Sequence, residues 1–144
     1  MNERWIPVLA AVVGVLGGMG GALVGGFVAN QGQTQRFEIE RQAAIQDVHT
    51  EAYATYLQAS IKTLYKLELL QAENEDVRSN PEYVKLVNTA IEAQPVVWLL
   101  ADSQLTDVTR RLTNALSDGD YDLVQELLGR FVELARKDVT EAGG

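Results

Sequence analysis

Apolar residues run without interruption from Ile6 to Ala29. These 24 residues contain no charged side chain and no Asn, Gln, Ser or Thr. A helix of this length would extend about 36 Å, enough to cross a bilayer core of about 30 Å with some tilt. Trp5 precedes the run, and tryptophan favours the headgroup region. The pattern predicts a single transmembrane helix in the cell (inner) membrane.

A cleaved signal peptide is the alternative interpretation of this run. The apolar core of a signal peptide has about 7–15 residues, fewer than are present here. We therefore expect a retained anchor. Arg4 precedes the run, whereas Arg36 and Arg41 follow it, so the positive-inside tally favours a cytoplasmic helical domain by one charge.

Glycine and alanine recur inside the run at four-residue spacing and form two adjacent rows. Small residues in such rows let helix backbones approach closely in lipid. Two rows favour a ring or higher oligomer over a simple dimer. The residues that we assign to this helix-packing interface are Gly14, Gly17, Gly18, Gly21, Gly25 and Gly26.

Other interpretations of the glycines fit less well. The third glycine of a dinucleotide fingerprint would fall at Leu23, and no Lys-Ser/Thr pair follows for a phosphate loop. An ion-carrying rotor ring requires an intramembrane carboxylate, and the run contains none.

Beyond the run, apolar residues recur with the helical period. Residues 34–72 contain no Pro or Gly and predict one long helix with a wide apolar face. Asn80-Pro81-Glu82 begins a second helix, with a cap, a proline in the first turn and an acidic residue near the N-terminus. Pro95 is expected to break or kink it near Gln94. The apolar face of the long helix is predicted to include Phe37, Ala44, Ile45, Val48, Ala52, Tyr56 and Ala59.

Asp102 can cap a further helix, and Asp120 can cap the last one after a turn at 117–120. We expect residues 34–72 to lead out, 81–117 to return and 120–139 to lead out again. The fold class is therefore all-α, a single N-terminal transmembrane helix followed by a small up-down-up bundle whose middle helix is broken near Pro95. The predicted segments are an anchor at 1–29, a juxtamembrane connector at 30–35, an acidic helical bundle at 36–140 and a flexible tail at 141–144.

Charge and composition exclude several classes of function. The net charge is −8, and Glu3 and Arg4 are the only charged residues before the bundle. An acidic domain without a basic stripe is a poor nucleic-acid binder, because phosphate neutralisation supplies most of that affinity. The chain has no cysteine, which removes disulfides and thiolate sites.

Side chains that could carry chemistry have simpler structural roles. His49, the single histidine, has no metal-ligand or catalytic spacing to another residue. Asp118, Asp120 and Asp122 alternate as at the start of a calcium loop, but Leu123 stands where that loop requires glycine. Capping explains these aspartates. We therefore expect no enzyme, no cofactor, no metal and no small-molecule substrate.

The Gly-rich span, the flanking Arg36 and Arg41, and the Tyr53-Ala-Thr-Tyr56-Leu57 element together carry a family resemblance. The chain resembles a loosely defined group of uncharacterised small single-pass membrane proteins of actinobacteria and their phages. Such proteins are often strongly basic after the span, and this chain is not. The resemblance implies the anchor and the helical domain, and no activity.

These observations predict a non-enzymatic, membrane-anchored interaction or scaffold protein that self-assembles or docks through its glycine-rich helix. Its expected partners are the lipid bilayer and either further copies of itself or another membrane protein. Two alternatives stay open. One is a membrane-permeabilising oligomer, holin-like or a defence effector, and the other is an accessory subunit of a larger membrane complex.

Overall fold

The computed structural model describes residues 33–142 of the chain, and they form an all-helical bundle, as predicted. The predicted span at 6–29 and its packing glycines lie outside these residues. No helix within 33–142 is apolar over a long enough stretch to cross a membrane. The elements are α2 (Gln33–Ala72), the 3₁₀-helix η1 (Val77–Ser79), α3 (Pro81–Leu100), α4 (Ser103–Asp118) and α5 (Tyr121–Ala142).

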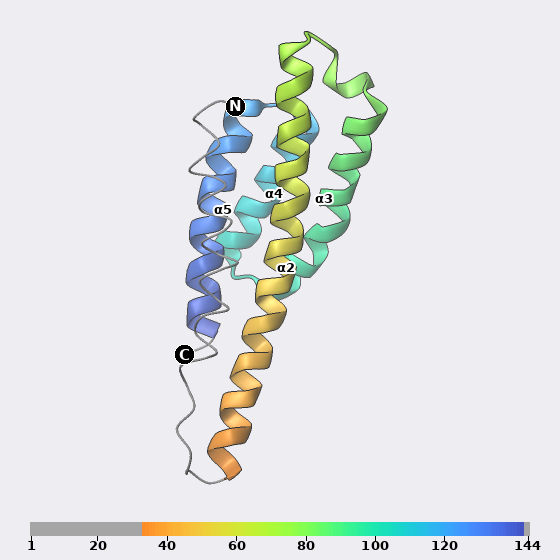
Figure 1. Cartoon of the computed structure of the whole chain (residues 1–144). Helices are drawn as coiled ribbons and strands as arrows, with labels where there is room; N and C mark the ends of the chain where they lie inside the picture. Colours follow the sequence, from red (N-terminus) through yellow and green to blue (C-terminus); the bar gives the residue numbers. More distant parts are fainter. Residues whose placement is uncertain (1–32, 143–144) are drawn as a thin grey trace.

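The four α-helices alternate in direction, up-down-up-down (Figure 1). The predicted up-down-up order was wrong, because it treated 81–117 as one returning arm. Ala101 and Asp102 instead have extended backbone, with ψ of 153° and 175°, and the chain reverses there. As a result Tyr83, at the start of α3, lies beside Leu116, at the end of α4, and its hydroxyl donates a hydrogen bond to the Leu116 carbonyl.

The predicted break near Pro95 was also wrong. α3 continues through Pro95 and ends at Leu100, so residues 96–100 are helical. Proline removes the N–H that the Ile91 carbonyl would otherwise accept. Pro95 lies on the exposed side of α3, where water can hydrogen-bond to that carbonyl in place of the missing N–H.

The predicted helix caps are confirmed. The carboxamide of Asn80 accepts from the Tyr83 N–H at 3.0 Å, and the carboxylates of Asp102 and Asp120 accept from the N–H groups of Leu105 and Leu123 at 2.8 and 3.1 Å. Two predicted segment limits shift. α2 begins at Gln33, inside the predicted connector, and α5 extends to Ala142, past the predicted end at 140.

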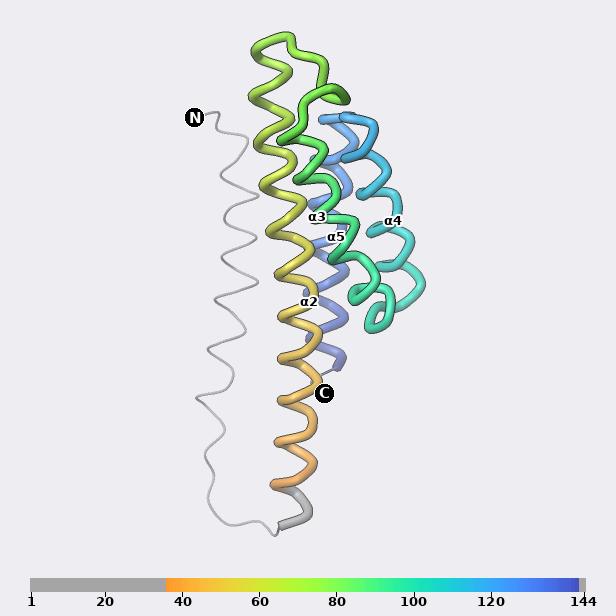
Figure 2. The backbone as a smooth tube through the Cα atoms, turned by 90° about the vertical axis from the view of Figure 1, so that its right-hand side faces the viewer, coloured from red at the N-terminus to blue at the C-terminus, as the bar shows by residue number. Residues whose placement is uncertain are grey.

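α2 is twice as long as α3, with 40 residues against 20, and its first turns project past the other helices (Figure 2). We call these turns the projecting part of α2. The predicted apolar face of α2 is therefore only partly covered. Ala52, Tyr56 and Ala59 are buried, whereas Phe37 is 78% exposed and Val48 is 52% exposed. The core lies around the upper part of α2, with Leu64, Leu67, Leu112, Leu116, Leu127, Leu128 and Phe131 among its fully buried side chains.

Candidate functional site

A polar cluster joins α2 to the C-terminal part of α5. The hydroxyl of Tyr53 donates to Asp138 Oδ2 at 2.6 Å, and His49 Nδ1 lies 2.8 Å from the same oxygen. Nδ1 therefore carries the proton shared with the carboxylate. His49 and Tyr53 also meet edge to face, with ring centroids 5.7 Å apart. These contacts hold the end of α5 against α2 at the level where α2 leaves the bundle.

The chemistry of this cluster favours a structural role for the tyrosine. Tyr53 is 2% exposed, and burial is the main cause that raises the pKa of its hydroxyl; the hydrogen bond to Asp138 and the charge of Asp138 add to it. The phenol therefore stays protonated and acts as a donor. Within residues 33–142 no group of three or more side chains is arranged to hold a metal ion.

Sequence reasoning did not find this cluster. Asp47 and Glu51, the acidic neighbours of His49 in sequence, point to other faces of α2, and the actual partner lies 89 residues further along the chain. The helical spacing of His49 and Tyr53, four residues apart, was a signal that they share a face. Nothing in the sequence indicates that Asp138 approaches that face.

Two further tyrosines link helices through buried hydroxyls. The Tyr56 hydroxyl donates to the Thr109 carbonyl at 3.0 Å and lies 2.8 Å from Thr113 Oγ1, which joins α2 to α4. Tyr83 makes the corresponding contact from α3 to α4. Burial raises the pKa of each of these two tyrosines to about 12.

These tyrosines predict a loss of stability at high pH. A pKa raised in the folded state means that the unfolded chain releases the proton first. The stabilisation is therefore complete below pH 10 and is lost as the pH rises toward 12. For Tyr56, the rise in pKa from 10 to about 12 corresponds to at most about 3 kcal/mol in the free energy of unfolding. Urea unfolding at pH 8 and pH 11 measures the loss of unfolding free energy between the two pH values. Tyr56→Phe should reduce this loss, whereas Tyr65→Phe, at a residue 57% exposed, should not.

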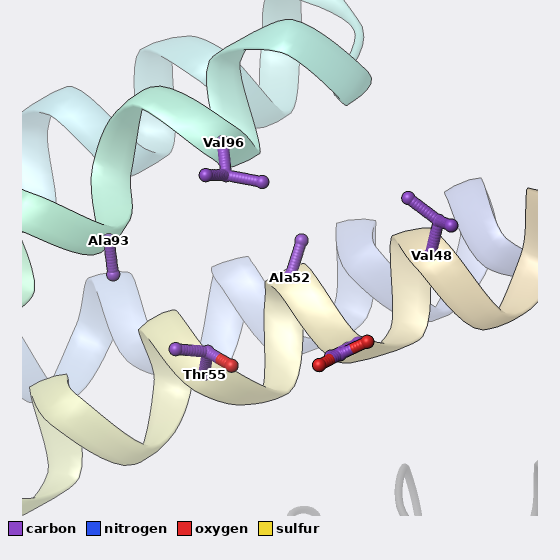
Figure 3. Close-up of a pocket in the computed structure, with 6 residues that line it drawn as sticks. Val48, Ala52, Thr55, Ala93 and Val96 are labelled. Carbon is purple, nitrogen blue, oxygen red and sulfur yellow. The ribbon is translucent and has the colours of Figure 1, made fainter.

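An open apolar groove runs between α2 and α3, next to the projecting part of α2. Figure 3 shows Val48, Ala52 and Thr55 of α2 opposite Ala93 and Val96 of α3. This hollow has a volume of about 230 Å³. A second hollow of about 300 Å³ adjoins it at Val48 and is lined by Ala44, Ile45 and Leu100. We call the two together the α2/α3 groove.

Helix length and side-chain size create this groove. α3 ends at Leu100, which lines the lower hollow together with Ala44 and Ile45, so α3 does not continue along the turns of α2 that precede this hollow. Ala52 and Ala93 have only a methyl group and leave space between the two helices. Val96 is 48% exposed and Ile45 is 39% exposed. Exposed apolar residues gathered in this way mark surfaces that bind other proteins or membranes.

Two charged side chains flank the groove. Arg41 lines its lower hollow and Glu51 lines its upper one. Both are exposed, and neither makes an ion pair with another side chain of the part of the chain that the structure describes. The groove therefore combines an apolar floor with one unpaired charge of each sign.

No family model, curated protein or solved structure matches the chain.

Proposed function

We propose that the chain is a membrane-anchored interaction protein whose bundle presents the α2/α3 groove to a partner. The observation that carries the proposal is the 24-residue apolar run at 6–29. Only residues 30–32 separate it from Gln33, the first residue of α2. The projecting part of α2 then acts as a stalk between the anchor and the bundle.

Electrostatics supports the same arrangement. The net charge of −8 comes from residues that follow the apolar run, because Glu3 and Arg4 cancel each other. Anionic headgroups repel an acidic domain. The bundle is thus held away from the bilayer, and its groove is open to a protein partner in the aqueous phase.

The predicted interface within the run is tested by substitution. Replacing Gly18 and Gly21 by leucine adds bulk to both small-residue rows and should remove self-association through the anchor, because the backbones can no longer approach. Native mass measurement of the full chain in mild detergent reports this loss. Val12→Leu, off both rows by helical spacing, should leave the mass unchanged. An unaltered mass in the double glycine variant would contradict the interface.

The anchor itself is tested by fractionation of cells that express the full chain. We expect the protein in the membrane fraction after an alkaline wash, and recovery in the soluble fraction would contradict the proposal. Dye leakage from the same cells would favour a membrane-permeabilising oligomer instead.

Because the chain has no cysteine, a Gln58→Cys variant reports on which side of the membrane the bundle lies. A membrane-impermeant thiol reagent should label it only after lysis if the bundle is cytoplasmic.

A further inference from the structure

One face of α2 continues from its projecting part into the α2/α3 groove. Phe37, Arg41, Ala44, Val48, Glu51 and Thr55 follow one another in alternating steps of four and three residues. This spacing places them on a single seam of the kind that pairs helices. Ala44 and Val48 lie two residues on either side of Gln46 in the sequence, and Arg41 and Glu51 lie five residues on either side of it.

We propose that a second copy of this chain occupies the groove in antiparallel orientation. The projecting part of each α2 lies in the α2/α3 groove of the other copy, around a two-fold axis perpendicular to α2 near Gln46. The contact is isologous, so each interaction occurs twice. Arg41 of each copy then meets Glu51 of the partner subunit, and Ala44 meets Val48 of the partner subunit.

Charge decides between the two possible directions of pairing. A parallel pair in register would place Arg41 beside its own counterpart and Glu51 beside its own counterpart, and such like-charge contacts are unfavourable. The antiparallel pair instead neutralises two exposed charges that make no ion pair within the described residues. The direction of the seam is thus set by the order of its charges.

The groove also has the shape that this occupant requires. Ala52 and Ala93 leave a hollow for an incoming helix, and the methyl group of Ala44 on the incoming seam permits close approach. Pairing covers apolar side chains that are exposed in the single chain, including Val48 at 52% and Val96 at 48%. Phe37, 78% exposed, reaches the level of Thr55 of the partner subunit.

The pairing rests on the proposed function, because the second copy is the partner to which the groove is presented.

Charge exchange in the full chain tests the pairing. The measurements use mild detergent and the Gly18→Leu, Gly21→Leu background, so that association reports on the bundle. We expect a dimer whose dissociation constant rises about tenfold or more in Arg41→Glu and in Glu51→Arg, because two attractive contacts become repulsive. The double variant Arg41→Glu, Glu51→Arg should restore dimerisation. Glu133→Arg, the same charge change on the exposed side of α5, should have no effect.

A monomeric chain, or a double variant as weak as the single ones, would overturn the pairing. Circular dichroism verifies that each variant keeps its helix content. Charge-dependent dimers of a chain that is recovered in the soluble fraction would leave the pairing intact and contradict the anchor of the proposed function.

Discussion

Replacing Phe131 by alanine should lower the free energy of unfolding of the bundle by about 3–5 kcal/mol, the usual cost of truncating a buried phenylalanine. Phe131 is completely buried in α5. Its ring meets Tyr53 edge to face, with centroids 6.2 Å apart, and lies 5.2 Å from the centroid of Tyr56. The substitution therefore opens a cavity at the contact between α2 and α5 and removes two aromatic contacts. Urea unfolding followed by circular dichroism measures the change.

Phe37→Ala is the matched control for this prediction. Phe37 is 78% exposed, so the same truncation should change the free energy of unfolding by less than about 0.5 kcal/mol. The comparison is made at concentrations that keep the chain monomeric, since Phe37 lies on the proposed pairing seam. Equal losses for the two variants would contradict the assignment of Phe131 to the core.

The helices of the bundle could be predicted from the sequence because their signals are local. The cap at Asn80, the proline at the start of α3 and the caps at Asp102 and Asp120 all act within one turn. Leu105, Val108, Leu112 and Leu116, the periodic apolar positions of α4, are all buried. Local chemistry and burial agree in α4, so its prediction needed no knowledge of the neighbouring helices.

The topology was less predictable because it depends on which of two breaks reverses the chain. Pro95 is the stronger helix breaker in sequence, yet it leaves α3 continuous because it lies on the exposed side of that helix. The reversal occurs at Ala101 and Asp102, where the only local signal is the cap. The proline rule takes no account of exposure, which the sequence alone does not provide.

The candidate site depended on relative helix lengths and on distant contacts. The apolar stripe of α2 predicted burial from Phe37 onward, but α3 ends too early to cover the first turns of α2. The exposed groove follows from that difference in length. Asp138 reaches His49 only because α5 returns along α2. That return could not be predicted from the helical periods, which specify faces and not partners.

Replacing Asp138 by alanine should lower the free energy of unfolding by about 2–4 kcal/mol. The substitution removes the acceptor for two donors, the Tyr53 hydroxyl at 2.6 Å and His49 Nδ1 at 2.8 Å. Tyr53 is 2% exposed, so its hydroxyl would lose its acceptor where water has little access. Hydrogen bonds to a charged group contribute about 1.5–3 kcal/mol each, and an unsatisfied buried donor carries a further cost. Chemical unfolding at neutral pH measures the loss.

A double-mutant cycle separates this contact from general effects on α5. Tyr53→Phe removes only the hydroxyl, so its cost and that of Asp138→Ala should not add, because both remove the same hydrogen bond. The control is Glu133→Ala, an acidic-to-alanine change on the exposed side of α5, with an expected effect within about 0.5 kcal/mol. Additive losses in the cycle would show that Asp138 stabilises α5 independently of Tyr53. The close contact between the two side chains predicts the opposite, a coupling that fixes the end of α5 against α2 close to its projecting part.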